Sequence, residues 1–374
     1  SEISFRYSIQ TDRQTRNVYL DIVKFFTIFL VVWGHVVQQT SLVGTWPIQE
    51  DPLMRLIYTM HMPLFMGICG YFFCKSVHKY DLVKLYISHK LLSRLLGLCI
   101  PMITFGLLKV LVGMAQGKQI SGAMLFMKEW FYASKGIWFL GDLGVNTVIV
   151  VLVLLFCKGT LKHDWKYFLI ALPLTVVPYI TYKSPHMYLY FVLGYWAGAY
   201  LHESAKHFLP LWKYALPIYI LAYAAFCNMP WPPEDIWYDY HHQTILQLAV
   251  NDGLKVILGI TGSFLVLVLL YHILPHIQEK WLYRRAIVEG RFTLDIYLLQ
   301  ILLVEMIFGN FHKTWVAAGG IDLFNFNFLE RTLATLIMVA IFMEILVFIS
   351  KLINRNRLLP KVLFFRSIKH NDEL

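Results

Sequence analysis

Apolar runs long enough to cross a membrane recur along the chain and restrict its fold more than any other feature. As an α-helix, a run of about twenty residues spans the roughly 30 Å hydrocarbon core of a bilayer. We identify about ten such runs and therefore expect an all-α membrane protein with about ten transmembrane helices. Their predicted ranges are 20–38, 53–73, 92–114, 136–156, 167–183, 186–202, 214–228, 253–274, 292–309 and 329–352.

The composition agrees with a membrane protein and disfavours two other classes. Of the 374 residues, 58% are hydrophobic and 15% are charged, against about 25% charged residues in soluble domains. Short segments of alternating polarity are missing, which disfavours an outer-membrane β-barrel. The net charge is +10, but the basic residues are spread over alternate loops instead of forming one patch. We therefore expect no nucleic-acid partner.

The placement of the basic residues predicts the orientation. About 23 of the 33 Lys and Arg residues fall in the segments 1–19, 74–94, 157–166, 203–213, 275–291 and 351–374. Positively charged loops stay on the cytoplasmic side, so both termini are expected there, and the bacterial inner membrane is the expected location. The chain then divides into a cytoplasmic segment 1–19, a single membrane domain 20–353 and a basic cytoplasmic tail 354–374.

The first apolar run carries three ionisable residues on one stripe: Asp21, Lys24 and His35. At 100° per residue, Lys24 and His35 come within roughly 20° of the same face, and Asp21 lies about 40° from His35. Lys24 and His35 are about 16 Å apart along the axis. Such groups are costly in hydrocarbon, so the stripe should face other helices or a water-filled cavity. A basic flank followed by a hydrogen-bonded core histidine explains the same spacing.

Short motifs follow one another through nearly the whole chain. They are Leu20-Asp21-x-x-Lys24 with His35, His61-Met62-Pro63-x-Phe65-x-x-x-Cys69-Gly70-x-Phe72, Lys90 and Arg94 before Pro101, Trp138-Phe139-Leu140, Tyr190-Phe191-x-x-Gly194-Tyr195-x-x-Gly198, and the segment 292–300 with Tyr297 and Gln300. Their order and spacing resemble the integral-membrane acyltransferases of family three. That family moves acyl groups from coenzyme A to hydroxyl groups of carbohydrates and lipids. The chain departs from the family pattern with Lys24 for Arg, Cys69 for Ser and Gln300 for His.

The resemblance implies a membrane O-acyltransferase and assigns roles to particular residues. The expected donor is acetyl-CoA or another acyl-CoA, and the expected acceptor is a hydroxyl of a glycan or lipid-linked sugar. Membrane lipid is a further expected partner, and no metal is expected. His35 is the expected general base, since the usual pKa of histidine, about 6.5, lies near working pH. The other expected site residues are Asp21, which would pair with a basic neighbour and orient it, Lys24, Lys90, Arg94 and Trp138 for the donor, and His61, Tyr297 and Gln300 for the acceptor.

Several alternatives stay open from the sequence. Walker A, nucleophile-elbow and H-E-x-x-H motifs are absent, so a nucleotide-driven pump and a serine hydrolase are poorly supported. A transporter or exporter without acyl-transfer chemistry, or a structural scaffold, also fits ten spans. A variant mechanism acylates His35 and relays the group outward. Glu305 and Glu344 lie inside predicted spans and are functional candidates without an assigned role.

Overall fold

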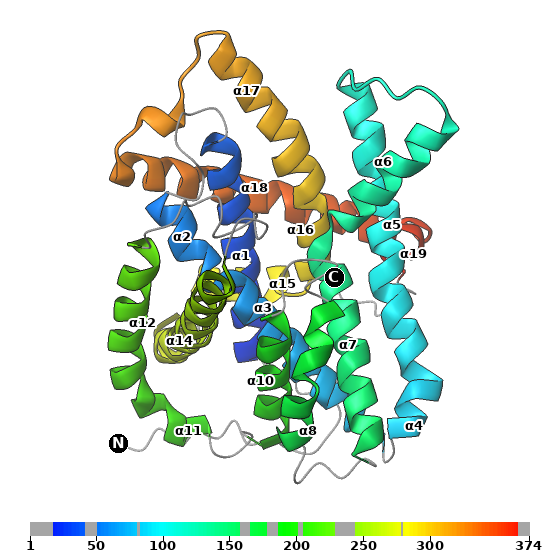
Figure 1. The fold of residues 1–374 in the computed structure, drawn as a ribbon. Helices are drawn as coiled ribbons and strands as arrows, with labels where there is room; N and C mark the ends of the chain where they lie inside the picture. The colour runs from blue at the N-terminus through cyan, green and yellow to red at the C-terminus, as the bar shows by residue number, and fades with distance from the viewer. Residues whose placement is uncertain are drawn as a thin grey trace.

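The computed structural model describes residues 18–41, 51–80, 83–157, 165–177, 186–200, 205–228, 244–277 and 280–365. Within these ranges every assigned element is a helix (Figure 1), which confirms the predicted all-α class. Eight helices there are long and apolar enough to cross a membrane. They are Val18–Thr40, Pro52–Val77, Val83–Ala115, Trp138–Phe156, Leu209–Cys227, Ala249–His276, Thr293–Ala317 and Phe328–Arg355.

These eight helices coincide with eight of the ten predicted spans. In the other two, the described helices are short: α8 (Trp165–Ile170) and η4 (Leu172–Thr175) in the predicted span 167–183, and α10 (Met187–Tyr200) in the predicted span 186–202. Residues 178–183 and 201–202 of those spans, and the termini 1–17 and 366–374, lie outside the described residues. The total of ten spans and the cytoplasmic termini therefore stay predictions.

The first helix, α1 (Val18–Ser41), lies in the middle of the molecule (Figure 1). It contacts α2 (Pro52–Tyr58), α3 (His61–Val77), α14 (Ile245–Ile277), α15 (Trp281–Glu289), α16 (Thr293–Gln300) and α18 (Phe328–Arg355). The Trp33 indole donates a hydrogen bond of 3.0 Å to the Thr335 hydroxyl on α18. Because other helices surround α1, its ionisable side chains are placed among protein groups, as membrane burial requires.

The third predicted span begins earlier than expected. A short helix α4 (Val83–Tyr86) and a π-helical turn η2 (Ile87–Leu91) lead into α5 (Leu92–Ala115). The helix α6 (Ala123–Lys135) then folds back along α5, where Gly106 lies directly against Ser134.

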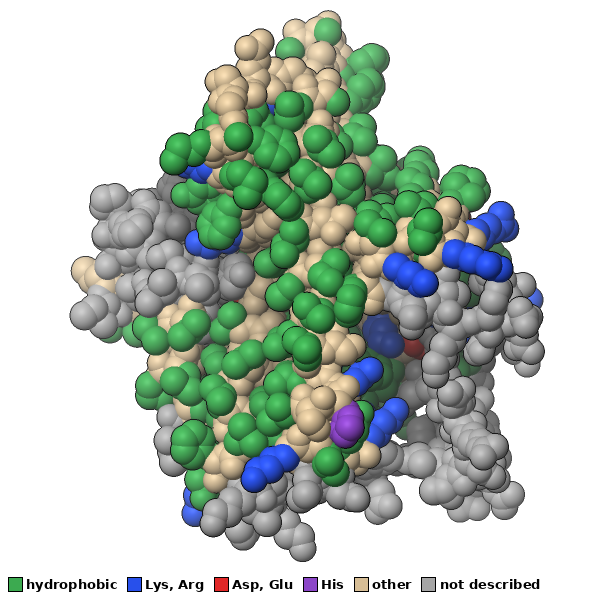
Figure 2. Space-filling model, turned by 90° about the vertical axis from the view of Figure 1, so that its right-hand side faces the viewer, with side chains coloured by type: hydrophobic (Ala, Val, Ile, Leu, Met, Phe, Trp, Pro, Cys, Tyr) green, Lys and Arg blue, Asp and Glu red, His purple; other side chains and the backbone are tan. Residues whose placement is uncertain are grey.

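Hydrophobic side chains cover most of the face formed around these helices, with Lys and Arg side chains near its lower and right-hand parts (Figure 2). An apolar outer face of this kind suits contact with lipid.

The helices α3 and α10 cross so closely that their backbones touch. A Cβ atom on Gly194 would meet the carbonyl oxygen of Gly67, and one on Gly70 would meet that of Phe191. Small residues at a crossing allow this close approach. The remaining elements are α7 (Trp138–Phe156), α11 (Ala205–Phe208), η5 (Leu209–Leu211), α12 (Trp212–Cys227), η6 (Ile301–Phe308), α17 (Gly309–Ala317), η7 (Leu323–Asn325) and α19 (Leu359–Phe364).

The crossing gives a direct stability prediction. We expect Gly70→Ala to destabilise the fold by about 1–3 kcal/mol, the usual cost of overpacking. The midpoint of thermal denaturation in detergent measures the effect. Gly97→Ala is the matched control, since a Cβ there meets nothing within 4 Å, and alanine favours a helix. Equal midpoints for the two variants would contradict the close crossing.

Candidate active site

His35 lies near the far end of α1 and is not sealed from its surroundings, since its side chain is 20% exposed. Its Nδ1 atom lies 3.3 Å from Oε1 of Glu305 on the π-helical segment η6, within ion-pair distance of a charged ring, but Nδ1 makes no hydrogen bond among the described residues. A neutral imidazole that gives its Nδ1 proton to a carboxylate keeps the lone pair of Nε2 free. A hydrogen bond formed across this contact would place the ring proton on Nδ1 and leave Nε2 to accept a proton.

Two further side chains hold the Glu305 carboxylate. The Gln300 amide donates a 3.3 Å hydrogen bond to Oε1, and Lys109 Nζ on α5 lies 4.0 Å from Oε2. The segment η6 packs against both α1 and α5. Four polar side chains from three segments of the chain therefore meet at one point inside the apolar core.

The π-helical turn explains why Gln300 and Glu305 can meet. In a regular α-helix, residues five apart point about 140° away from each other. The segment Ile301–Phe308 is π-helical, and the wider i→i+5 turn brings residues of this spacing onto one face. Sequence reasoning left Glu305 without a role and missed Lys109, because no short motif marks a π turn or a neighbouring helix. A π turn inside a helix is often a sign of a functional site.

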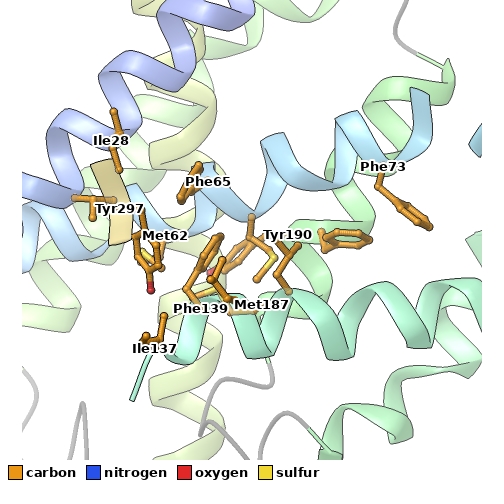
Figure 3. Packing of buried hydrophobic residues seen from close by; sticks show 14 of the residues in the cluster. Ile28, Met62, Phe65, Phe73, Ile137, Phe139, Met187, Tyr190 and Tyr297 are labelled. Atoms are coloured by element: carbon orange, nitrogen blue, oxygen red, sulfur yellow. The ribbon is translucent and has the colours of Figure 1, made fainter. Parts of the chain in front are cut away.

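A cavity of about 290 Å³ opens beside the first half of α1. Aromatic and aliphatic side chains from α3, α5, α7 and α16 form most of its walls, and Lys24 and Arg291 are the charged residues that line it. Within the walls, Phe65 and Phe139 stack at 4.8 Å, and Tyr297 meets Phe139 edge-on at 5.7 Å (Figure 3). The cavity suits a ligand with an anionic end and a largely apolar body.

Tyr297 connects this cavity to the polar cluster. It lines the cavity, only 4% of it is exposed, and its hydroxyl lies within electrostatic range of Glu305. One turn later along α16 comes the fully buried Gln300. Tyr297 is therefore placed between the cavity and the carboxylate that pairs with His35.

The structure gathers three of the predicted donor-binding and positioning residues near the cavity. Lys24 Nζ lies 3.4 Å from Asp21 Oδ1 and 4.2 Å from the centre of the Phe72 ring. The Arg94 guanidinium lies 5.0 Å from the Phe73 ring on α3. The thiol of Cys69, on the cavity wall, is within electrostatic range of both cations. Lys24 therefore lines the cavity, whereas Arg94 packs on Phe73 and is not among the lining residues.

Three other predicted residues lie elsewhere. Lys90 is exposed on η2 and does not line the cavity. Trp138 begins α7 and packs edge-on against Phe139 at 6.1 Å without lining the cavity. His61 is buried, with Nδ1 hydrogen-bonded to the Ile57 carbonyl at 2.7 Å, and it lies within electrostatic range of His35.

Comparison with known proteins agrees with the chemistry of this arrangement. Residues 17–349 match the family described as the acyltransferase domain. The chain is 27% identical over 308 residues to nodulation protein NolL of Sinorhizobium fredii, covering 79% of this chain and 80% of that protein. A 66-residue segment, 18% of each chain, is 38% identical to nodulation protein NolL of Mesorhizobium japonicum. No solved structure matches the chain. With a family match that spans most of its length, and with eight membrane-spanning candidates in its described residues, the chain belongs to the acyltransferase family and is a multi-pass membrane acyltransferase.

Proposed function

We propose that this protein is an O-acyltransferase of the bacterial inner membrane. It takes an acetyl or similar short acyl group from cytoplasmic acyl-CoA and places it on a hydroxyl of a glycan or lipid-linked sugar. Family membership supports the reaction class. The observation that carries the proposal is the pairing of His35 Nδ1 with the Glu305 carboxylate at 3.3 Å. This pairing provides the base that acyl transfer to an alcohol needs.

In the proposed step, His35 Nε2 removes the proton of the acceptor hydroxyl as its oxygen attacks the thioester carbonyl. An ester bond forms, the carbon–sulfur bond breaks, and coenzyme A leaves as a thiolate that takes the proton from the imidazolium. Glu305 stabilises that imidazolium and holds the ring in the tautomer with a free Nε2, as the carboxylate does in catalytic triads. Gln300 and Lys109 keep the carboxylate in place.

The donor is proposed to lie along the first half of α1. Lys24 and Arg94 bind its phosphates by charge-assisted contacts, with Asp21 orienting Lys24 through their 3.4 Å pair. The gap of about 16 Å between Lys24 and His35 matches the reach needed to bring a thioester to the base. Lys90 and Trp138 act further out, Lys90 at the cytoplasmic mouth and Trp138 behind the wall formed by Phe139.

The acceptor is proposed to approach His35 from the other side. Gln300 belongs to the polar cluster, Tyr297 lies within electrostatic range of Glu305, and the buried Oε1 of Gln300 lacks a hydrogen-bond partner among the described residues. An unpaired buried acceptor atom suits a hydroxyl donor from a sugar. His61 is close enough to influence His35 electrostatically and orients the acceptor side of the site. In the variant mechanism, His35 Nε2 is itself acylated first, and trapping acyl-histidine with donor alone would favour it.

The first test removes the base. We expect His35→Ala to abolish transfer of labelled acetyl groups from acetyl-CoA to the membrane glycan fraction, because it removes the proposed general base. The control is His272→Ala, at an exposed histidine on α14. Both variants must be present in the membrane at wild-type amounts. Unchanged transfer by His35→Ala would refute the assigned base. Movement of a glycan across the membrane without consumption of acetyl-CoA would instead identify a transporter.

A second test addresses the carboxylate. We expect Glu305→Gln to lower kcat by about 10²- to 10⁴-fold, the range typical of impaired general-base catalysis, with little change in KM for the donor. Glu344→Gln is the control, because that carboxylate is 55% exposed and pairs with Arg285 away from the cluster. Steady-state kinetics in nanodiscs measures both parameters. A kcat for Glu305→Gln equal to that of the control would exclude the positioning role.

A further inference from the structure

The cavity is lined by two cations that come from distant parts of the sequence. Lys24 lies on α1, and Arg291 lies in the turn between α15 and α16. Resting on the proposed function, we propose that Arg291 and Lys24 form a clamp for the diphosphate of the acyl-CoA donor at one end of this cavity. The motifs that identify the family's donor site point to Lys24, Lys90 and Arg94, and Arg291 is an addition from the geometry.

Gly290 determines where Arg291 lies. It caps the C-terminus of α15, and a Cβ atom there would collide with the backbone carbonyl of Asp21. The turn is therefore pressed against the first turns of α1, three residues before Lys24. Because Arg291 follows Gly290 directly, its side chain starts beside the turn of α1 that carries Lys24, and both line the same space.

The charges around the turn leave Arg291 available for a ligand. The nearby Arg285 pairs with Glu289 at 2.8 Å and also with Glu344. Lys24 pairs with Asp21. In the described part of the chain no acidic side chain lies within 4 Å of Arg291, and its side chain is exposed. A guanidinium group binds phosphate oxygens through two parallel hydrogen bonds, which an ammonium group does not match.

The rest of the cavity indicates what accompanies the phosphates. Beyond the two cations, the walls are mainly aliphatic and aromatic. They include Phe65, Phe139 and Tyr297, which Figure 3 labels within the packed core. A ligand that fits both parts has an anionic head and a long, weakly polar arm. An acyl-CoA has this form, with its diphosphate at one end of the pantetheine arm and its thioester at the other. With the head at Lys24 and Arg291, the arm points toward Tyr297 and the His35 cluster.

The test compares two donors with one variant and its matched control. Arg291→Gln is assayed with acetyl-CoA and with S-acetylpantetheine, which lacks the phosphates. For acetyl-CoA we expect KM to rise about 10- to 100-fold, as for the loss of a charge-assisted contact, with kcat changed less than about twofold. With S-acetylpantetheine, Arg291→Gln should match the wild type. Arg284→Gln, at an exposed arginine on α15 that does not line the cavity, should match the wild type with both donors.

Binding of coenzyme A to the protein in nanodiscs, measured without turnover, separates this proposal from the proposed function. The clamp predicts weaker binding by Arg291→Gln and partial recovery in Arg291→Lys. Equal coenzyme A affinity for wild type and Arg291→Gln, or an equal loss of activity with both donors, would overturn the clamp. Coenzyme A binding that depends on Arg291, without any transfer of acetyl groups, would support the clamp and contradict the proposed function.

Discussion

The pairing of an imidazole with a carboxylate inside the membrane is the interaction on which the site depends. Each group alone would be costly among apolar helices, so ionisable residues there need partners. His35 Nδ1 and Glu305 Oε1 lie 3.3 Å apart, so each group has the other as its partner. Gln300 and Lys109 contact the same carboxylate. The central position of α1 makes this possible, because α16, η6 and α18 all pack against it. The packing of these helices thus holds the cluster together.

In the proposed function, the donor and the base lie at two ends of one helix, α1. The cavity beside Lys24 and Arg291 is apolar along most of its wall, whereas the His35 cluster is polar. Tyr297 belongs to both, since it lines the cavity and its hydroxyl lies in electrostatic range of Glu305. Such an arrangement separates binding of a charged head group from proton transfer at the reacting atoms. It also keeps water-soluble phosphates away from the apolar centre of the protein.

The sequence predicted the parts of this arrangement that follow from regular helices. Apolar run length predicted the class and eight spans that the structure contains, and the helical period predicted one stripe for Asp21, Lys24 and His35. The role of Glu305 could not be predicted, because its contact with Gln300 needs a π turn that hydropathy does not reveal. Motifs pointed to Trp138, whereas the next residue, Phe139, lines the cavity. Which neighbour faces the cavity is decided by packing between helices distant in sequence.

The tautomer of His35 tests the central pairing most directly. Nitrogen-15 NMR of histidine-labelled protein in lipid bilayers reports which ring nitrogen carries the proton, with the His35 signals assigned by their loss in His35→Gln. The pairing predicts that Nδ1 carries a proton, and that this nitrogen signal changes when Glu305 becomes Gln. A ring protonated at Nε2, with signals that are the same in both proteins, would contradict the account.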